Sequence, residues 1–177
     1  MRSVKGIFKP AAAFVAMLVL LSSLTFASID DNTVQWNTIV GVITAQGVDN
    51  PISANIHSGT FAWSTRGGQA SVNLATGSVS FSVNGLVING TQFSGTPGPI
   101  SAVTGTLVCN PGTNQESTRD TQPVPLNSRG NARFSGSLGS VPANCDNPLF
   151  LVRIAVPQGA AGRWIATGAQ RTFGEQD

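Results

Sequence analysis

The stretch Ser78-Val-Ser-Phe-Ser-Val83 alternates serine with a large apolar residue over six positions. Successive side chains of a β-strand point to opposite faces of the sheet, so Val79, Phe81 and Val83 share one face and the serines share the other. This pattern predicts a strand with one buried and one solvated face. No long helical period of apolar residues follows residue 27, and the sequence therefore predicts an all-β fold.

On both sides of this strand, short runs of Val, Ile, Thr, Phe and Trp are separated by Gly, Asn and Pro. The runs predict further strands at Val34–Trp36, Ile39–Ala45, Ile52–Trp63, Val72–Leu74, Leu86–Ile88, Ile100–Cys109, Val124–Leu126, Ala132–Leu138, Phe150–Val156 and Arg163–Ala169. Many short strands without helices favour an antiparallel β-sandwich, with Greek-key connectivity of the Ig-like or jelly-roll-like kind. A partly open barrel is the alternative.

The run Ile52–Trp63 changes phase along its length. Ile52, Ala54 and Ile56 fall on one parity, whereas Phe61 and Trp63 fall on the other. One extra residue corrects such a change, and glycine supplies the positive φ that this type of bulge needs. The sequence therefore predicts a bulge at Ser58-Gly59, with Phe61 and Trp63 facing the core.

The first 27 residues have the pattern of a signal peptide. Arg2, Lys5 and Lys9 precede an apolar run, and Thr25-Phe-Ala27 supplies small residues at the cleavage site. The apolar run is shorter than the roughly 20 residues of a membrane-spanning helix. We expect cleavage after Ala27, a single domain over 28–177, a location in the periplasm or outside the cell, and contact with the membrane only through the signal peptide.

Removal of the leader changes the charge of the chain. Ten basic residues become seven, all of them arginine and scattered singly, against eight acidic residues. No basic stripe is left that could attract a polyanion, which argues against nucleic acid as a partner. The mature sequence also contains no lysine, and this excludes Schiff-base chemistry.

Two cysteines in an exported chain indicate one structural disulfide, Cys109 to Cys145. A zinc site would need more ligands than this pair and a single histidine provide, and no calcium-loop motif occurs. We therefore expect neither a metal nor a cofactor. The bridge would hold the polar segment Asn110–Gln122 and the segment Ser140–Pro148 at the same end of the domain.

Catalytic candidates are few. His57 and Ser58, with Asp49 or an N-terminal aspartate, could be drawn as a nucleophilic triad, but no strand-to-helix elbow or oxyanion hole accompanies them. The acidic residues lie in loops or near the termini, so no carboxylate pair for glycoside hydrolysis is evident. We expect no catalytic residue.

The sequence favours a secreted, non-catalytic binding or structural module with an extracellular ligand, either a glycan or a protein. Loops on a rigid scaffold often carry binding residues, so Asn110, Arg119 and Asp120 are the first candidates. Trp36 and Trp164 are an alternative, as a platform for stacking sugars if they are exposed. A secreted hydrolase with a site in its loops is the alternative function.

Two short segments resemble each other. Ser64-Thr-Arg-Gly67 and Asn127-Ser-Arg-Gly130 both read as hairpin tips. Each would project an arginine into solvent, which is expected of a tip without any function. Asn89-Gly90-Thr91 matches a glycosylation sequon, but a turn is the favoured interpretation.

We predict that the exported form begins at Ser28, because the small residues at the end of the leader direct cleavage after Ala27. Intact-mass measurement of secreted material checks this. Recovery of the chain from the membrane fraction with residues 1–27 attached would contradict it.

Overall fold

A computed structural model describes residues 32–157 and 160–173 of the chain. The predicted leader, its cleavage site and the N-terminal aspartates lie outside the described residues. Within them, no helix is long and apolar enough to cross a membrane.

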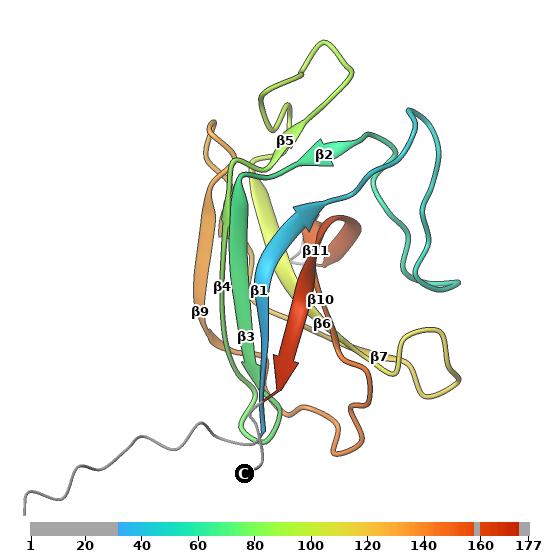
Figure 1. Cartoon of the computed structure of the whole chain (residues 1–177), viewed down its shortest axis with the longest axis vertical. Helices are drawn as coiled ribbons and strands as arrows, with labels where there is room; N and C mark the ends of the chain where they lie inside the picture. Colours follow the sequence, from blue (N-terminus) through green and yellow to red (C-terminus); the bar gives the residue numbers. More distant parts are fainter. Residues whose placement is uncertain (1–31, 158–159, 174–177) are drawn as a thin grey trace, which may run out of the picture.

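The strands are antiparallel, and most of them belong to one sheet (Figure 1). They are β1 (Thr33–Gly41), β2 (Trp63–Ser64), β3 (Gly67–Asn73), β4 (Ser78–Asn84), β5 (Val87–Ile88), β6 (Ala102–Cys109), β7 (Ser117–Asp120), β8 (Val124–Pro125), β9 (Ala132–Ser137), β10 (Leu149–Ala155) and β11 (Ala161–Phe173). The main sheet has the order β7-β6-β10-β11-β1-β3-β4-β9, with β8 also beside β6, and β2 pairs with β5 in a small second sheet.

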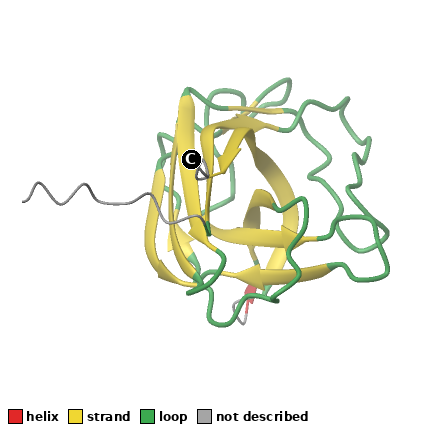
Figure 2. Cartoon of the chain, turned by 60° about the horizontal axis from the view of Figure 1, so that its bottom comes forward, coloured by secondary structure: helices red, strands yellow, loops and turns green. Residues whose placement is uncertain are grey.

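The main sheet curls until residues of distant strands touch. β11, β1 and β3 separate β10 from β4 in the sheet order, yet the rings of Phe150 and Phe81 lie 5.5 Å apart between centroids. Gly105 on β6 makes this approach possible, because a Cβ there would lie 2.7 Å from Phe81 and 2.8 Å from Phe150. Figure 2 shows the strands curving around the interior of the sheet.

The core lies inside this curl. Trp36 packs against Phe150 with a centroid distance of 5.6 Å and lies directly over Gly168. On β4, Val79, Phe81 and Val83 are buried as the alternation predicts. Strand β6 is buried from Val103 to Cys109, so both of its faces are covered.

The all-β antiparallel class is confirmed, whereas the sandwich with Greek-key connectivity is not. The main sheet is a half-barrel, closer to the partly open barrel that was the alternative. The physical reason is the pairing of large rings with glycines. Gly105 and Gly168 leave room for aromatic side chains from other strands, so one sheet fills its own interior.

The prediction of a strand over Ile52–Trp63 is wrong, and so is the bulge within it. Of this run only Trp63 belongs to a named strand, and Ser58 makes an isolated parallel bridge to Trp164. β1 stops pairing with β11 at Gly41, and the 57–59 segment then takes the vacated position beside β11. Residues 42–62 are therefore a long loop that returns to the sheet.

Other differences concern strand boundaries. The two strands expected before residue 46 are one strand, β1. The polar segment after Cys109 contains the strand β7, which has no apolar residue and pairs with the end of β6. β11 extends further in both directions than the apolar run indicates.

Cys109 and Cys145 form the predicted disulfide, with their Cα atoms 4.6 Å apart. The bridge joins the end of β6 to the segment before β10, and so holds two loops together across 36 residues of sequence. A disulfide is compatible with an oxidising compartment.

We predict that Gly105→Ala destabilises the fold by about 1–3 kcal/mol, because the added methyl group overlaps two aromatic rings that cannot both move aside. Urea denaturation of the purified chain checks this. Gly59→Ala is the matched control, since the atom nearest to its Cβ would be a side-chain methyl carbon of Ile165 at 3.1 Å. Equal or higher stability of Gly105→Ala would contradict the close approach of the rings.

Candidate functional site

The three residues that the sequence offers as a triad, Asp49, His57 and Ser58, lie close together in the 42–62 loop. Nδ1 of His57 contacts Oδ2 of Asp49 in a short ion pair. On the other side of the imidazole ring, Nε2 lies 2.9 Å from the carbonyl oxygen of Ala54. Both neighbours are hydrogen-bond acceptors, so the contacts suit the protonated imidazole, in which both ring nitrogens donate.

Ser58 is fully buried beside this pair. Its hydroxyl donates to the carbonyl of Gly59 at 2.8 Å and accepts from the amide of Asn50 at 2.8 Å. Its own amide donates to Oδ1 of Asp49 at 3.0 Å. No hydrogen bond joins Ser58 to the imidazole of His57 among the described residues.

Arg163 completes the cluster from β11. Its guanidinium donates to the carbonyl of Ser58 at 2.7 Å and lies 3.6 Å from Oδ1 of Asp49. Backbone bonds join the same two segments, from Gly59 to Trp164 at 2.7 Å and from Trp164 to His57 at 3.0 Å. The cluster therefore holds the 42–62 loop against β11.

This arrangement does not provide the chemistry of a triad. A general base needs a free ring nitrogen within reach of the nucleophile, but Nε2 of His57 donates to a carbonyl of its own loop. A nucleophile must be open to substrate, whereas Ser58 is buried and its hydroxyl is engaged. The cluster contains the residue types of a hydrolase triad, but their hydrogen bonds connect them to the loop and to each other rather than preparing a nucleophile.

The electrostatics of the pair follow from the same contacts. The hydrogen bond from His57, together with the amide of Ser58, lowers the pKa of Asp49 below its usual 3.8. The hydrogen bond to Asp49, with that to Ala54, raises the pKa of His57 above its usual 6.5. The nearby Arg163 acts against the charge on His57, but this effect is smaller.

At the disulfide end, Asn110 organises the loops. Its backbone has φ 53°, and its side-chain amide donates to the carbonyl of Asn144 at 2.8 Å. Its side-chain oxygen accepts from the amide of Asp146 at 2.9 Å. With only 8% of Asn110 exposed, this predicted binding residue is a structural link between the two loops.

The other two predicted residues also make internal contacts. Arg119 donates to the backbone carbonyls of Ser140 and Thr118 at 2.8 Å each. Asp120 accepts from the hydroxyl of Thr106 at 2.5 Å. The structure places both on β7, at the edge of the sheet near the disulfide, with polar atoms already in use.

A hollow of about 420 Å³ lies between the two loops that the disulfide connects, and residues from the ranges 110–115 and 146–147 contribute to its lining. Its wall includes Asn114, Gln115 and Asn147, whose side-chain amides make no hydrogen bond within the described residues, and the carboxylate of Asp146. The sequence pointed to these loops as the place for a site, but not to these residues. The only local signal was a dense run of amide side chains.

The tryptophans are not available as a sugar platform. Trp36 is 1% exposed and Trp164 is 5% exposed, so neither indole face can stack on a ring in solution. Trp36 fills the interior of the curled sheet, and Trp164 lies under the segment that carries Ser58. Trp63, expected in the core, is buried.

Comparison with known proteins gives no functional assignment. No protein-family model, curated protein or solved structure matches this chain. The described residues also contain no group of three or more His, Cys, Asp or Glu side chains placed to hold a metal ion.

We predict that the contacts of Ser58 with Asp49 are strongest between about pH 3.8 and pH 6.5 and weaken at higher pH. A raised pKa of His57 stabilises the folded loop fully below its ordinary pKa and loses this effect as the pH rises through the folded-state value. The lowered pKa of Asp49 stabilises the folded loop above the ordinary pKa of the carboxyl group, and this stabilisation is lost as the pH falls through the folded-state value.

Hydrogen exchange followed by NMR measures the effect. The protection factor of the Ser58 amide should fall between pH 6 and pH 9, whereas that of Val42, which donates to Ile165, should stay constant. In His57→Gln the dependence should disappear. Equal protection of Ser58 at both pH values, or a dependence that survives in His57→Gln, would show that the ion pair does not hold the loop.

Proposed function

We propose that this chain is an exported, non-catalytic binding module whose ligand is a hydroxyl-rich molecule such as a neutral glycan. The observation that carries the proposal is the hollow at the disulfide end, where the amides of Asn114, Gln115 and Asn147 have no hydrogen-bond partner within the described residues. A primary amide both donates and accepts, and a sugar hydroxyl does the same. The two chemistries are complementary.

The surroundings of the hollow support binding by a preformed site. The disulfide and the side chain of Asn110 connect the two loops that form its wall. Glu116 adds a further link, accepting from the amide of Gly112 at 2.8 Å and from the hydroxyl of Ser53 at 2.8 Å. Loops held in this way lose little conformational entropy when a ligand binds.

A secreted hydrolase remains the alternative function. It is favoured only by the presence of His57, Ser58 and Asp49 in one cluster, and the contacts described above argue against catalysis there. If the alternative held, His57→Ala would eliminate turnover of a substrate without preventing its binding.

We predict that Asn114→Ala combined with Asn147→Ala weakens glycan binding about tenfold, because two neutral hydrogen bonds of about 0.5–1.5 kcal/mol are lost. A neutral-glycan array identifies a bound oligosaccharide, and calorimetry then measures its affinity. The matched control is Ser80→Ala with Ser135→Ala, which removes two exposed hydroxyls from another polar hollow of the sheet.

Two results would contradict this proposal. Unchanged affinity in the double asparagine variant would place the site elsewhere. Shortening of the bound oligosaccharide, detected by mass spectrometry and abolished by His57→Ala, would establish the hydrolase instead.

A further inference from the structure

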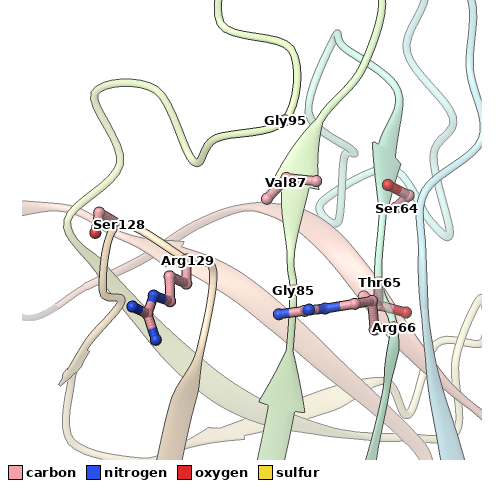
Figure 3. Close-up of a pocket in the computed structure, with 8 residues that line it drawn as sticks. All are labelled: Ser64, Thr65, Arg66, Gly85, Val87, Gly95, Ser128 and Arg129. Atoms are coloured by element: carbon pink, nitrogen blue, oxygen red, sulfur yellow. The ribbon is translucent and has the colours of Figure 1, made fainter.

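The two segments of similar sequence are not the tips of β-hairpins, because β2 does not pair with β3 and β8 does not pair with β9. They are turns between strands, called tips below, and they line one hollow. Ser64-Thr-Arg-Gly67 leads into β3, and Asn127-Ser-Arg-Gly130 joins β8 to β9. β4 lies between β3 and β9 in the sheet, so the tips flank the end of β4 on either side. Together they line a surface hollow of about 380 Å³, completed by Gly85, Val87 and Gly95 (Figure 3).

Local hydrogen bonds fix this arrangement. The amide of Arg66 donates to the carbonyl of Asn84 at 2.8 Å. The amide of Gly85 donates to the side chain of Asn131 at 2.9 Å, which joins the end of β4 to the second tip. The amide of Arg129 donates to the side chain of Asn127 at 3.0 Å and closes that tip.

Glycine at position 85 determines where the Arg66 side chain lies. A Cβ on Gly85 would lie 2.6 Å from Nε and 3.0 Å from Cγ of Arg66, so the arginine rests directly on the backbone there. Gly85 has φ +63°, a conformation that other residues adopt at a cost. In Figure 3 the Arg66 side chain crosses the chain at Gly85 toward the tip that carries Arg129.

The charges of Arg66 and Arg129 are not neutralised within the described residues. Neither guanidinium has a hydrogen-bond or ion-pair partner there, whereas four other arginines donate to backbone carbonyls, namely Arg119, Arg153, Arg163 and Arg171. No acidic residue lines the hollow. The hydroxyl of Ser128, on the rim, likewise has no partner among these residues.

Acidic groups lie elsewhere in the described structure. Glu116, Asp120 and Asp146 belong to the disulfide end, and Asp49 is paired with His57. β8, which leads to the second tip, pairs with the first residues of β6, whereas the disulfide is at the last residue of β6. Roughly 20–25 Å of strand therefore separates the positive end from the acidic end.

We propose that the hollow between Arg66 and Arg129 binds an oxyanion, namely a carboxylate, sulfate or phosphate group. Guanidinium groups match such anions with paired hydrogen bonds, and Ser128 adds a further donor. This site is distinct from the amide-lined hollow in position and in the charge of its ligand. Nucleic acid fits it poorly, since no aromatic side chain lines the hollow for base stacking.

The oxyanion has two possible sources, a free inorganic ion or an acidic group attached to a saccharide. Calorimetry at low ionic strength distinguishes them, with sodium sulfate, sodium phosphate and a heparin tetrasaccharide as the ligands. Binding of sulfate or phosphate alone identifies a site for the free ion. Binding of the tetrasaccharide at concentrations where the inorganic ions do not bind identifies an acidic saccharide.

We predict that Arg66→Gln and Arg129→Gln each weaken binding of the anion about tenfold or more, since each removes charge-assisted hydrogen bonds. Arg66→Lys should recover only part of the loss, because lysine keeps the charge without the planar fork. The affinity of the wild-type chain should fall with added salt, because ions screen the attraction between exposed charges.

Arg133→Gln is the matched control. Arg133 is exposed on β9, has no partner among the described residues, and lies outside the hollow. Its loss removes the same charge and should change the affinity less than about twofold. An equal loss in Arg133→Gln would indicate diffuse surface attraction and overturn the site.

Absence of any anion binding, or binding unchanged in both Arg66→Gln and Arg129→Gln, would also overturn it. Melting temperatures of the variants show that the fold is retained, and Arg129→Gln alone carries the test if Arg66→Gln is destabilised. Neutral-glycan binding that depends on Asn114 and Asn147 is measured separately. Failure of this site is thus distinguishable from failure of the proposed function.

Discussion

The contact between Phe81 and Phe150 is the constraint on which the rest of the structure depends. These rings meet across the sheet only because Gly105 has no side chain between them. Aromatic side chains bury large apolar surfaces, and this burial stabilises the fold. The contact holds the sheet in its curl, so the main sheet supplies both sides of its own core. A side chain at position 105 would force the rings to shift.

The curl also determines what lies at each end of the sheet. At one end the tips beside β3, β4 and β9 carry Arg66 and Arg129, which line the same hollow. At the other end the connections are long and would be loose without the disulfide and Asn110. Two of the hollows formed by the described residues thus differ in character. One has arginines without partners, and the other has amides beside a carboxylate.

The sequence predicts those features that depend on neighbouring residues. Alternation in β4, the all-β class and the disulfide are confirmed because each follows from local pattern or residue type. Ile52–Trp63 failed because long-range contacts decide its shape, among them those of His57 and Ser58 with β11. β7 was missed because its four residues have no apolar pattern, and pairing with β6 alone makes them a strand.

In the candidate sites too, local sequence predicts some features and long-range contacts decide the others. The loops of the disulfide end could be named from sequence, but which of their polar groups remain free depends on the folded contacts of Asn110 and Arg119. The likeness of the two tips was visible, yet their proximity depends on the strand order. Burial of Trp36 likewise follows from the glycine opposite it, not from its own neighbours in sequence.

Hydrogen-bonding capacity separates structural polar groups from candidate binding groups in this fold. The residue types of a nucleophilic triad are present in His57, Ser58 and Asp49, but all three have hydrogen-bond partners within the fold. Arg66 and Arg129 appear as ordinary hairpin residues, and folding leaves their donors unsatisfied within the described structure. A guanidinium group forms charge-assisted hydrogen bonds with an anion, and these are stronger than hydrogen bonds between neutral groups. Two arginines without partners among the described residues, both lining one hollow, are therefore stronger evidence for binding than the residue types of the histidine cluster are for catalysis.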